Sequence, residues 1–309
     1  MDSPTREHRD RDFRVPFRDN IQRAIERVIE NYRSCTICER RCQVNRWEGE
    51  LGFCKLPKDA FVYKEYLHLG EEMTIIPSHT FFLGGCSLRC LHCTDASDVE
   101  LPNQGDRLDP VSMAEKIRFR RKQGARNVNF VGGEPDVNIY AILRLLEALD
   151  EPVPVIWNTN ALATPFTLDT LTGIVSIYLA DLKHGNDSCA RQITRFADYM
   201  NVVRRNLLIA AERFELMVRH LVIPGHVACC TKPALEWLEK NLPHVTVNVM
   251  TGYLPFNREK LPETMNRRLA EDERAEAVDF LRTLNFRKTM IDGRWSIAPQ
   301  DGVAFSPPD

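Results

Sequence analysis

Three cysteines between residues 84 and 93 have the spacing of a metal-binding loop. Residues 84–93 read GGCSLRCLHC, so three and then two residues separate Cys86, Cys90 and Cys93. A loop of this length can place three sulfurs around one face of a cubane. Iron–sulfur clusters normally take four cysteine ligands. This loop would therefore leave one iron open to a substrate or a cofactor.

A catalytic zinc ion is the main alternative for this loop, because three thiolates and a water molecule also form such a centre. Zinc deaminases combine their cysteines with an H-x-E arrangement, which does not accompany these three. We interpret His92, between two of the thiols, as a packing or hydrogen-bonding residue rather than a ligand. The spacing, directly after a predicted strand, favours the iron–sulfur cluster.

A second cysteine-rich segment lies earlier in the chain. Gaps of two, three and eleven residues separate its thiols, which belong to Cys35, Cys38, Cys42 and Cys54. Four thiolates close a tetrahedral site for zinc or hold a second iron–sulfur cluster. Unrelated buried cysteines are the weaker interpretation, because so short a segment has few apolar residues and needs a metal to fix its structure. The thiolate charge would be offset by Arg40, Arg41 and Arg46. The sequence predicts a metal here and leaves zinc and iron–sulfur open.

The remaining cysteines lie outside both groups. They are Cys189, Cys229 and Cys230. The simplest interpretation of an isolated cysteine is a small buried hydrophobic residue. We therefore assign them no role.

The elements that must position these thiols follow an α/β pattern. Short apolar runs separated by helical stretches predict strand–helix units and a parallel sheet. We place six strands, at residues 80–83, 127–131, 153–158, 174–181, 214–223 and 246–250. Helices are predicted at residues 17–32, 111–123 and 271–284. The second of these has Asp109 as its cap and Pro110 at its first position.

Polar side chains lie on one face of the predicted strands. They are Asn127, Asn129, Asn158, Asn160, Asp181, Lys183, Glu215, Arg219 and Asn248. A closed eight-stranded barrel fills its interior with branched apolar residues. A polar interior lined by six strands therefore predicts a partial, open (β/α)6 barrel that holds a polar ligand. An open sheet with one solvated face is the alternative.

The chain of 309 residues is long enough for one large domain. We expect residues 1–16 to form a flexible tail, 17–78 a helix and the four-cysteine metal module, and 79–309 the barrel with a C-terminal extension. The formal charge of -2 excludes a global field that attracts nucleic acid or anionic membrane. The charged N-terminus and the lack of a long apolar run argue against a signal peptide or a spanning helix. We expect a cytoplasmic protein without a membrane or nucleic-acid partner.

Three motifs together resemble the radical S-adenosylmethionine (SAM) superfamily, in the branch of pyruvate formate-lyase activating enzymes and their uncharacterised relatives. They are the three-cysteine loop, the GGEP turn of residues 132–135 and the DLK step of residues 181–183. The four-cysteine segment also resembles the N-terminal part of those relatives. The resemblance implies that Cys86, Cys90 and Cys93 hold a [4Fe-4S] cluster whose fourth iron chelates S-adenosylmethionine. Reductive cleavage to a 5'-deoxyadenosyl radical then implies an electron donor such as flavodoxin or ferredoxin.

The same resemblance suggests further contacts with the cofactor. Gly132 and Gly133 would let backbone groups approach the methionine ammonium, and Glu134 would supply negative charge. The ribose hydroxyls and the carboxylate would be bound by Asp181 and Lys183. Arg219, five residues before a Pro-Gly pair, would hold the carboxylate or the substrate, and Asn158 is a candidate by position alone.

Two departures from the family pattern concern the surroundings of the cluster. His92 stands where an aromatic residue often precedes the third cysteine, and Thr94-Asp95 replaces a common Gln-Asn pair. These departures affect what can be expected of the reduction potential of the cluster and of the fit of the substrate. They do not affect the expectation that the cluster binds.

The leading interpretation of the function is a radical SAM oxidoreductase of the activating-enzyme type, which abstracts hydrogen from a protein or peptide. An extended backbone could be hydrogen-bonded by Asn129, Asn160, Arg219 and Asn248. The alternatives are a radical SAM enzyme for a small metabolite, with its barrel covered by its own chain, and a non-catalytic iron–sulfur electron-transfer protein. An electron carrier would not need an open iron.

Overall fold

The computed structural model describes residues 17–298, whose strands form one mixed sheet. The strands are β1 (Phe61–His68), β2 (Ser78–Leu83), β3 (Asp106–Arg107), β4 (Asn127–Gly132), β5 (Val155–Thr159), β6 (Ile177–Asp181), β7 (Glu215–Leu221), β8 (Thr246–Met250), β9 (Lys288–Ile291) and β10 (Arg294–Ile297). Their order across the sheet is β10-β9-β8-β7-β6-β5-β4-β2-β1-β3. Neighbours from β2 to β9 pair in parallel, whereas β1, β3 and β10 add antiparallel edges. Since the order runs from β10 to β3 without closing, the barrel is open and partial, as predicted.

All six predicted strands are confirmed, with shifted ends for every strand except β8. The sequence analysis missed β1, β3, β9 and β10, which lie at the two margins of the sheet. β1 is only partly buried and carries charged residues such as Lys64 and Glu65, so it lacks the apolar run of a central strand. β9 and β10 have four residues each, too few for a clear alternation.

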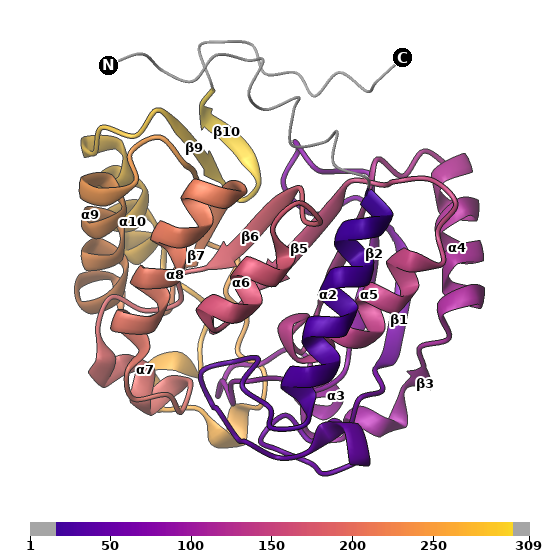
Figure 1. Ribbon diagram of the computed structural model, residues 1–309. Coiled ribbons are helices and arrows are strands. Elements are labelled where there is room, and N and C mark those ends of the chain that lie inside the picture. Colours follow the sequence, from indigo (N-terminus) through magenta and orange to yellow (C-terminus); the bar gives the residue numbers. More distant parts are fainter. Residues whose placement is uncertain (1–16, 299–309) are drawn as a thin grey trace.

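The described helices are α2 (Phe17–Tyr32), α3 (Ala96–Glu100), α4 (Pro110–Lys122), α5 (Ile139–Glu147), α6 (Pro165–Leu171), α7 (Asp187–Ile193), α8 (Tyr199–Arg213), α9 (Lys232–Asn241) and α10 (Glu271–Thr283). The three predicted helices correspond to α2, α4 and α10. At the start of α4, the Asp109 side chain accepts a hydrogen bond from the Ser112 amide at 2.8 Å, as expected for the cap. Figure 1 shows α2, α5, α6 and α8 across one face of the strands, with α4 beyond one edge and α9 and α10 beyond the other.

The interior of the barrel is less polar than the sequence analysis predicted. A separate buried cluster consists of Ile75, Ile156, Ile177, Leu179 and Met217. The last four come from β5, β6 and β7, and Ile75 comes from the loop between β1 and β2. The inner face of the central strands therefore carries apolar as well as polar side chains. The loop between β1 and β2 packs against the apolar ones through Ile75.

The loop between β1 and β2 also supplies hydrogen-bond acceptors to polar side chains inside the barrel. The Glu72 carboxylate accepts hydrogen bonds of 2.6 Å from both Nε and Nη2 of Arg219, and one of 2.8 Å from Nδ2 of Asn248. Glu71 accepts from Nδ2 of Asn129 at 2.6 Å. Burial raises the pKa of Glu72, but the charge and hydrogen bonds of Arg219 outweigh it, so the pKa lies below its ordinary value. The side-chain donors Nδ2 of Asn129, Nε and Nη2 of Arg219 and Nδ2 of Asn248 are therefore engaged within the chain, whereas we had expected these residues to hydrogen-bond an extended peptide.

Residues 17–298 contain no helix that is both long and apolar enough to cross a membrane. The predicted tail, residues 1–16, and the last part of the C-terminal extension, residues 299–309, lie outside the described residues.

Candidate functional site

A cavity of about 540 Å³ lies at the carboxyl ends of the parallel strands, where ligands of α/β proteins commonly bind. It is bordered by every residue that the sequence analysis assigned to the cluster and its cofactor: Cys86, Cys90, Cys93, Gly132, Gly133, Glu134, Asn158, Asp181, Lys183 and Arg219. Among the described residues of this lining, Cys86, Cys90 and Cys93 are the only cysteines. The fold thus brings segments more than 100 residues apart to one site.

Glycines hold the three-cysteine loop against the turn that follows β4. Gly132 has a φ of 110°, and a Cβ atom added there would collide with the backbone of Leu83. A Cβ atom added to Gly133 would collide with the carbonyl oxygen of Gly85. In the structure, these two glycines allow the backbone of residues 83–85, at the start of the cysteine loop, to approach closely.

The thiols of the loop are buried in a setting that disfavours free thiolates. Sγ of Cys86 lies 3.3 Å from the Leu88 amide and 3.5 Å from Nδ2 of Asn160. Burial raises the pKa of Cys86 and raises that of Cys90 to about 12, although the charge of Lys183 opposes the shift at Cys90. Thiolate ligands at this position therefore require additional positive charge, which a bound metal supplies.

Asp181 and Lys183 form an ion pair at the edge of the cavity. Nζ of Lys183 lies 2.5 Å from Oδ2 of Asp181. The phenol of Tyr199, at the start of α8, accepts from the Lys183 amide at 2.7 Å and donates to the Asp181 carbonyl at 3.3 Å. Tyr199 thus fixes the turn that presents both charged groups, a role that its sequence context does not indicate.

Glu134 attaches the turn after β4 to the end of β5. Its carboxylate accepts from Oγ1 of Thr159 at 2.6 Å and from the Asn160 amide at 2.9 Å. The neighbouring Asp136 accepts from Nε1 of Trp157 at 2.7 Å. Burial, together with the charge of Asp136, raises the pKa of Glu134 well above its ordinary value. The carboxylate of Glu134 therefore has a positioning role within the chain as well as a place at the cavity.

Asn158 leaves a buried hydrogen-bond donor without a partner in the cavity lining. Its Oδ1 accepts from Nη1 of Arg219 at 3.3 Å, whereas its Nδ2 meets no acceptor in the protein. Buried amide donors are nearly always paired in folded proteins. The free donor of Asn158 thus fits a site that is completed by a polar ligand, whereas Arg219 is already held by Glu72.

Residues 251–260 border the mouth of the cavity. Nδ2 of Asn257 donates to the carbonyl of Cys93 at 3.1 Å, which attaches this segment to the cysteine loop. The rings of His92 and Tyr253 lie 5.9 Å apart, in agreement with a packing role for His92. Leu254 and Phe256 also line the cavity, and they are 40% and 39% exposed. The mouth therefore has an apolar, solvent-accessible rim.

The four-cysteine segment packs directly on the three-cysteine loop. The ring of Phe53 contacts two guanidinium groups, with Arg40 at 3.9 Å and Arg89 at 4.4 Å from its centroid. Arg89 also donates to the Phe53 carbonyl at 2.6 Å, and Arg40 donates to the Ser87 carbonyl at 2.8 Å. In Figure 1 the indigo loops that follow α2 lie at the same end of the molecule as α3 and α7. The two cysteine-rich segments therefore form one continuous structure.

The thiols of the four-cysteine segment border one small cavity, lined by Cys35, Cys38, Cys42 and Cys54. Beside it, Arg46 is 1% exposed, donates to backbone carbonyl groups and lies 4.1 Å from the ring centroid of Tyr32. Burial raises the pKa of Cys35, and the charge of Arg46 opposes that shift. A buried cation needs a countercharge. Thiolates bound to a metal would provide one at this position.

Sequence reasoning did not identify Glu72, Tyr199 or Asn257. Their contacts, with Arg219, with the turn after β6 and with the cysteine loop, join segments that are distant in sequence. The one available signal was the pair of acidic residues at 71–72 immediately before an otherwise apolar stretch.

Comparison with known proteins gives a consistent result. A family model described as the Radical SAM superfamily matches residues 80–238. The chain is 38% identical over 260 residues to the uncharacterized protein MJ0674 of Methanocaldococcus jannaschii, and the match covers 82% of this chain and 76% of that protein.

Two solved structures resemble the chain more distantly. Streptococcus suis SuiB, crystallised with its precursor peptide SuiA, is 14% identical with a TM-score of 0.48, and the match covers 67% of this chain and 46% of SuiB. A domain of pyruvate-formate lyase-activating enzyme from Bacteroides vulgatus is 20% identical with a TM-score of 0.41, over 53% of this chain and 98% of the domain.

Proposed function

The chain belongs to the radical SAM superfamily, and from that membership we propose that Cys86, Cys90 and Cys93 hold its [4Fe-4S] cluster. The observation that carries the proposal is the cavity at the barrel mouth, which gathers these three thiols with the residues expected around the cofactor. Three cysteine ligands leave one iron free. When bound and reduced, the cluster would supply the electron that cleaves S-adenosylmethionine to a 5'-deoxyadenosyl radical.

The residues around the cluster would contribute in different ways to binding of the cofactor. Asn158 has an unpaired buried donor, and Asp181 and Lys183 present opposite charges at the cavity edge. These three are the side chains we propose as direct contacts. Gly132 and Gly133 would contribute backbone groups, whereas Glu134 and Arg219, each held by partners within the chain, would mainly shape the site.

For the substrate we propose a residue of a protein or peptide, which would make the chain an oxidoreductase of the activating-enzyme type. Exposed apolar side chains at a cavity mouth favour contact with another polypeptide, and Leu254 and Phe256 supply them. A small metabolite is the second candidate, favoured because Tyr253 and Asn257, from the chain's own C-terminal part, line the cavity and Asn257 is bonded to the cysteine loop.

At the four-cysteine segment we propose an iron–sulfur cluster rather than a single zinc ion. Thiolates that share one zinc ion lie about 3.8 Å apart, given a Zn–S bond of about 2.3 Å. Within residues 17–298, these four sulfurs do not belong to a set whose ligand atoms all lie within 4.8 Å of one another. A wider spacing suits a cluster, whose sulfurs bind different irons. Because the segment packs on the three-cysteine loop, it could pass electrons inward from a donor such as flavodoxin or ferredoxin.

Cleavage of S-adenosylmethionine tests the proposed chemistry. Anaerobically reconstituted and reduced protein should form 5'-deoxyadenosine and methionine, measured by chromatography with mass detection. Replacing Cys90 by Ala should abolish both products, because the cluster loses a ligand. The matched control is Ser97→Ala, an exposed residue nearby that does not line the cavity. If Cys90→Ala cleaves the cofactor as well as the parent does, the cluster assignment is wrong.

Deuterium transfer distinguishes the two classes of substrate. Enzyme, reductant and cofactor are incubated with deuterated peptides or deuterated metabolites, and 5'-deoxyadenosine is analysed for deuterium. Transfer from a peptide would support the polypeptide assignment. Transfer from a metabolite and from no peptide would contradict it while leaving the radical chemistry intact.

Metal analysis tests the four-cysteine site. The variant with Cys86, Cys90 and Cys93 replaced by Ala should retain iron and sulfide, and the further changes Cys38→Ser and Cys42→Ser should remove them. Loss of zinc rather than iron on the changes Cys38→Ser and Cys42→Ser would contradict the cluster. An unchanged metal content after these two changes in folded protein would contradict the site itself.

A further inference from the structure

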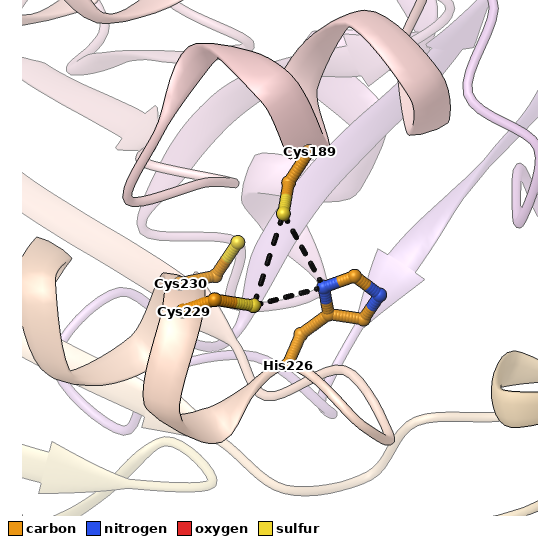
Figure 2. Close-up of side chains that lie close together, drawn as sticks. All are labelled: Cys189, His226, Cys229 and Cys230. Atoms are coloured by element: carbon orange, nitrogen blue, oxygen red, sulfur yellow. Dashed lines mark hydrogen bonds between the residues drawn. The ribbon is translucent and has the colours of Figure 1, made fainter.

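We propose that Cys189, His226, Cys229 and Cys230 bind a single tetrahedral metal ion, with zinc as the ion best suited to them. The sequence analysis assigned no role to these cysteines, yet the fold gathers their sulfurs with one imidazole (Figure 2). The four ligand atoms all lie within 4.8 Å of one another. This site is separate from the cavity at the barrel mouth, because none of the four residues lines that cavity.

The distances among Cys189, Cys229 and His226 match those around one ion, and Sγ of Cys230 lies within 4.8 Å of their ligand atoms. Sγ of Cys189 lies 3.8 Å from Sγ of Cys229, and Nδ1 of His226 lies 3.6 Å from the first sulfur and 3.3 Å from the second. Zinc bonds are about 2.3 Å to sulfur and 2.0–2.1 Å to nitrogen. The edges of such a tetrahedron are about 3.8 Å between two sulfurs and about 3.6 Å between sulfur and nitrogen. The side chains therefore already stand near the positions of ligands.

Local backbone structure explains how the group assembles. His226, Cys229 and Cys230 have helical i, i+3 and i+4 spacing, which places three side chains on one face. His226 caps a π-helical turn, Val227–Thr231, which contains both cysteines, and the Cys230 amide donates to the His226 carbonyl at 2.9 Å. Such turns are frequent at functional sites. Cys189 approaches from α7 and completes the set from a different segment.

The side-chain amide of Asn186 is fixed next to two of the sulfurs. The Asn186 side chain caps α7 by accepting from the Cys189 amide at 2.8 Å, and its Nδ2 donates to the Cys229 carbonyl at 2.7 Å. The same Nδ2 lies 3.3 Å from Sγ of Cys189 and 3.8 Å from Sγ of Cys230. Donors aimed at sulfur favour the thiolate, which is the form that binds metal. At Gly185, a Cβ atom would collide with the Cys230 carbonyl, so the two segments are packed as closely as glycine allows.

Other uses of the same residues fit the geometry less well. Thiolates of an iron–sulfur cubane bind different irons and lie farther apart than ligands of one ion. A disulfide between Cys189 and Cys229 would bring their sulfurs to about 2.05 Å. A disulfide would also not explain why Cys230 and His226 lie beside these two cysteines. Three cysteines and one histidine form a common closed zinc set, which indicates a structural rather than a catalytic ion.

A metal here would connect the segments that follow β6 and β7. α7 begins shortly after Lys183, and the π-helical turn begins shortly after Ile223, and both of these residues line the cavity. Cys189 also packs against the apolar cluster that contains Ile223 and Tyr253. The ion would thus stabilise one wall of the cavity from behind.

Metal content of variants tests the site directly. Purified full-length protein should lose about one equivalent of zinc when Cys189→Ser and Cys229→Ser are combined, because two of four ligands are removed. Ala228→Ser, an exposed change in the same turn, should lose none. The difference in zinc content between these two variants excludes any metal that the other cysteines hold, because both variants retain those cysteines. An equal zinc content in both folded variants would overturn the proposal.

A second measurement needs no variant and therefore does not depend on folding of one. In untreated protein, the exposed Cys229 should resist alkylation by iodoacetamide, and it should react at least tenfold faster after zinc is removed with a chelator. Peptide mass spectrometry identifies the modified residue. Rapid alkylation of Cys229 in untreated protein would overturn the proposal. So would a Cys189–Cys229 disulfide in protein that contains no zinc.

Discussion

The two levels of the barrel interior use similar polar side chains for opposite purposes. Deep in the barrel, Asn129 and Asn248 are paired with Glu71 and Glu72 from the loop between β1 and β2, and Glu72 also holds Arg219, which borders the cavity. At the carboxyl ends of the strands, polar groups border a cavity of about 540 Å³ instead.

The difference shows that polar residues on the inner face of a barrel do not by themselves indicate a ligand. What distinguishes the upper level is an unpaired donor. In the deep level Nδ2 of Asn129 and Nδ2 of Asn248 are bonded, although Oδ1 of Asn129 lacks a partner. In the upper level the amide nitrogen of Asn158 lacks an acceptor, and three thiols lie together without a countercharge that matches them. A ligand-binding site is therefore better indicated by buried donors that lack an acceptor within the chain, such as Nδ2 of Asn158.

The largest effect is expected from breaking the pairing of the deep level. Glu72→Ala should lower the free energy of unfolding by about 3 kcal/mol, because the buried Arg219 guanidinium loses the carboxylate that binds it at 2.6 Å and retains that of Glu71 at 3.6 Å. Urea denaturation followed by circular dichroism measures the change. The double variant Glu72→Met with Arg219→Met should recover most of the loss, since buried pairs can often be replaced by apolar residues of similar size. A loss below about 1 kcal/mol in the single variant would show that Glu72 does not hold this level together.

A smaller effect should separate the two levels in ligand binding. Asn158→Ala should weaken binding of S-adenosylmethionine to the reconstituted enzyme about 5–10-fold, as expected for loss of one hydrogen bond of about 1–1.4 kcal/mol. Asn129→Ala should leave this affinity unchanged and lower stability instead, because its amide is bonded to Glu71. Calorimetric titration measures the affinity of both variants. Equal weakening in both would contradict the division of the interior into a paired and a binding level.

The fold was predictable from sequence where burial is continuous. The central strands are apolar runs, and β8 was predicted at its exact bounds. The margins were not predictable, since β1 is half exposed and β9 and β10 are short. For the site, the three-cysteine loop and the turns after β4 and β6 were identifiable because each motif is local in sequence.

Features that depend on distant segments could not be predicted. Glu72 meets Arg219 across 147 positions, and Cys189 meets Cys229 across 40. Which polar residues face each other inside the barrel depends on strand register and on the path of the loop between β1 and β2. For the same reason, His226, Cys229 and Cys230 do not by themselves predict a metal site from the sequence. The set of four ligands becomes visible once the fold brings Cys189 of α7 beside them (Figure 2).

The smallest expected effect is the response of the deep level to acid. Arg219 holds the pKa of Glu72 below its ordinary value of 4.5. A carboxyl group whose pKa is lowered by folding contributes stability that is fully present above the unfolded pKa and is lost as pH falls through the folded pKa. Stability should therefore decline below pH 4.5, and one group contributes at most about 1.4 kcal/mol per pH unit to that slope.

Glu72→Gln isolates this contribution, because glutamine preserves the shape of the side chain but does not titrate. The variant should be less stable than the parent near neutral pH, and the difference should shrink as the pH falls below 4.5. Urea unfolding between about pH 3.5 and pH 7 measures both curves. Glu151→Gln, an exposed change, should follow the parent throughout. If the parent and Glu72→Gln instead remain a constant distance apart over this range, the pairing with Arg219 does not shift the ionisation of Glu72, and the deep level is held by shape rather than by charge.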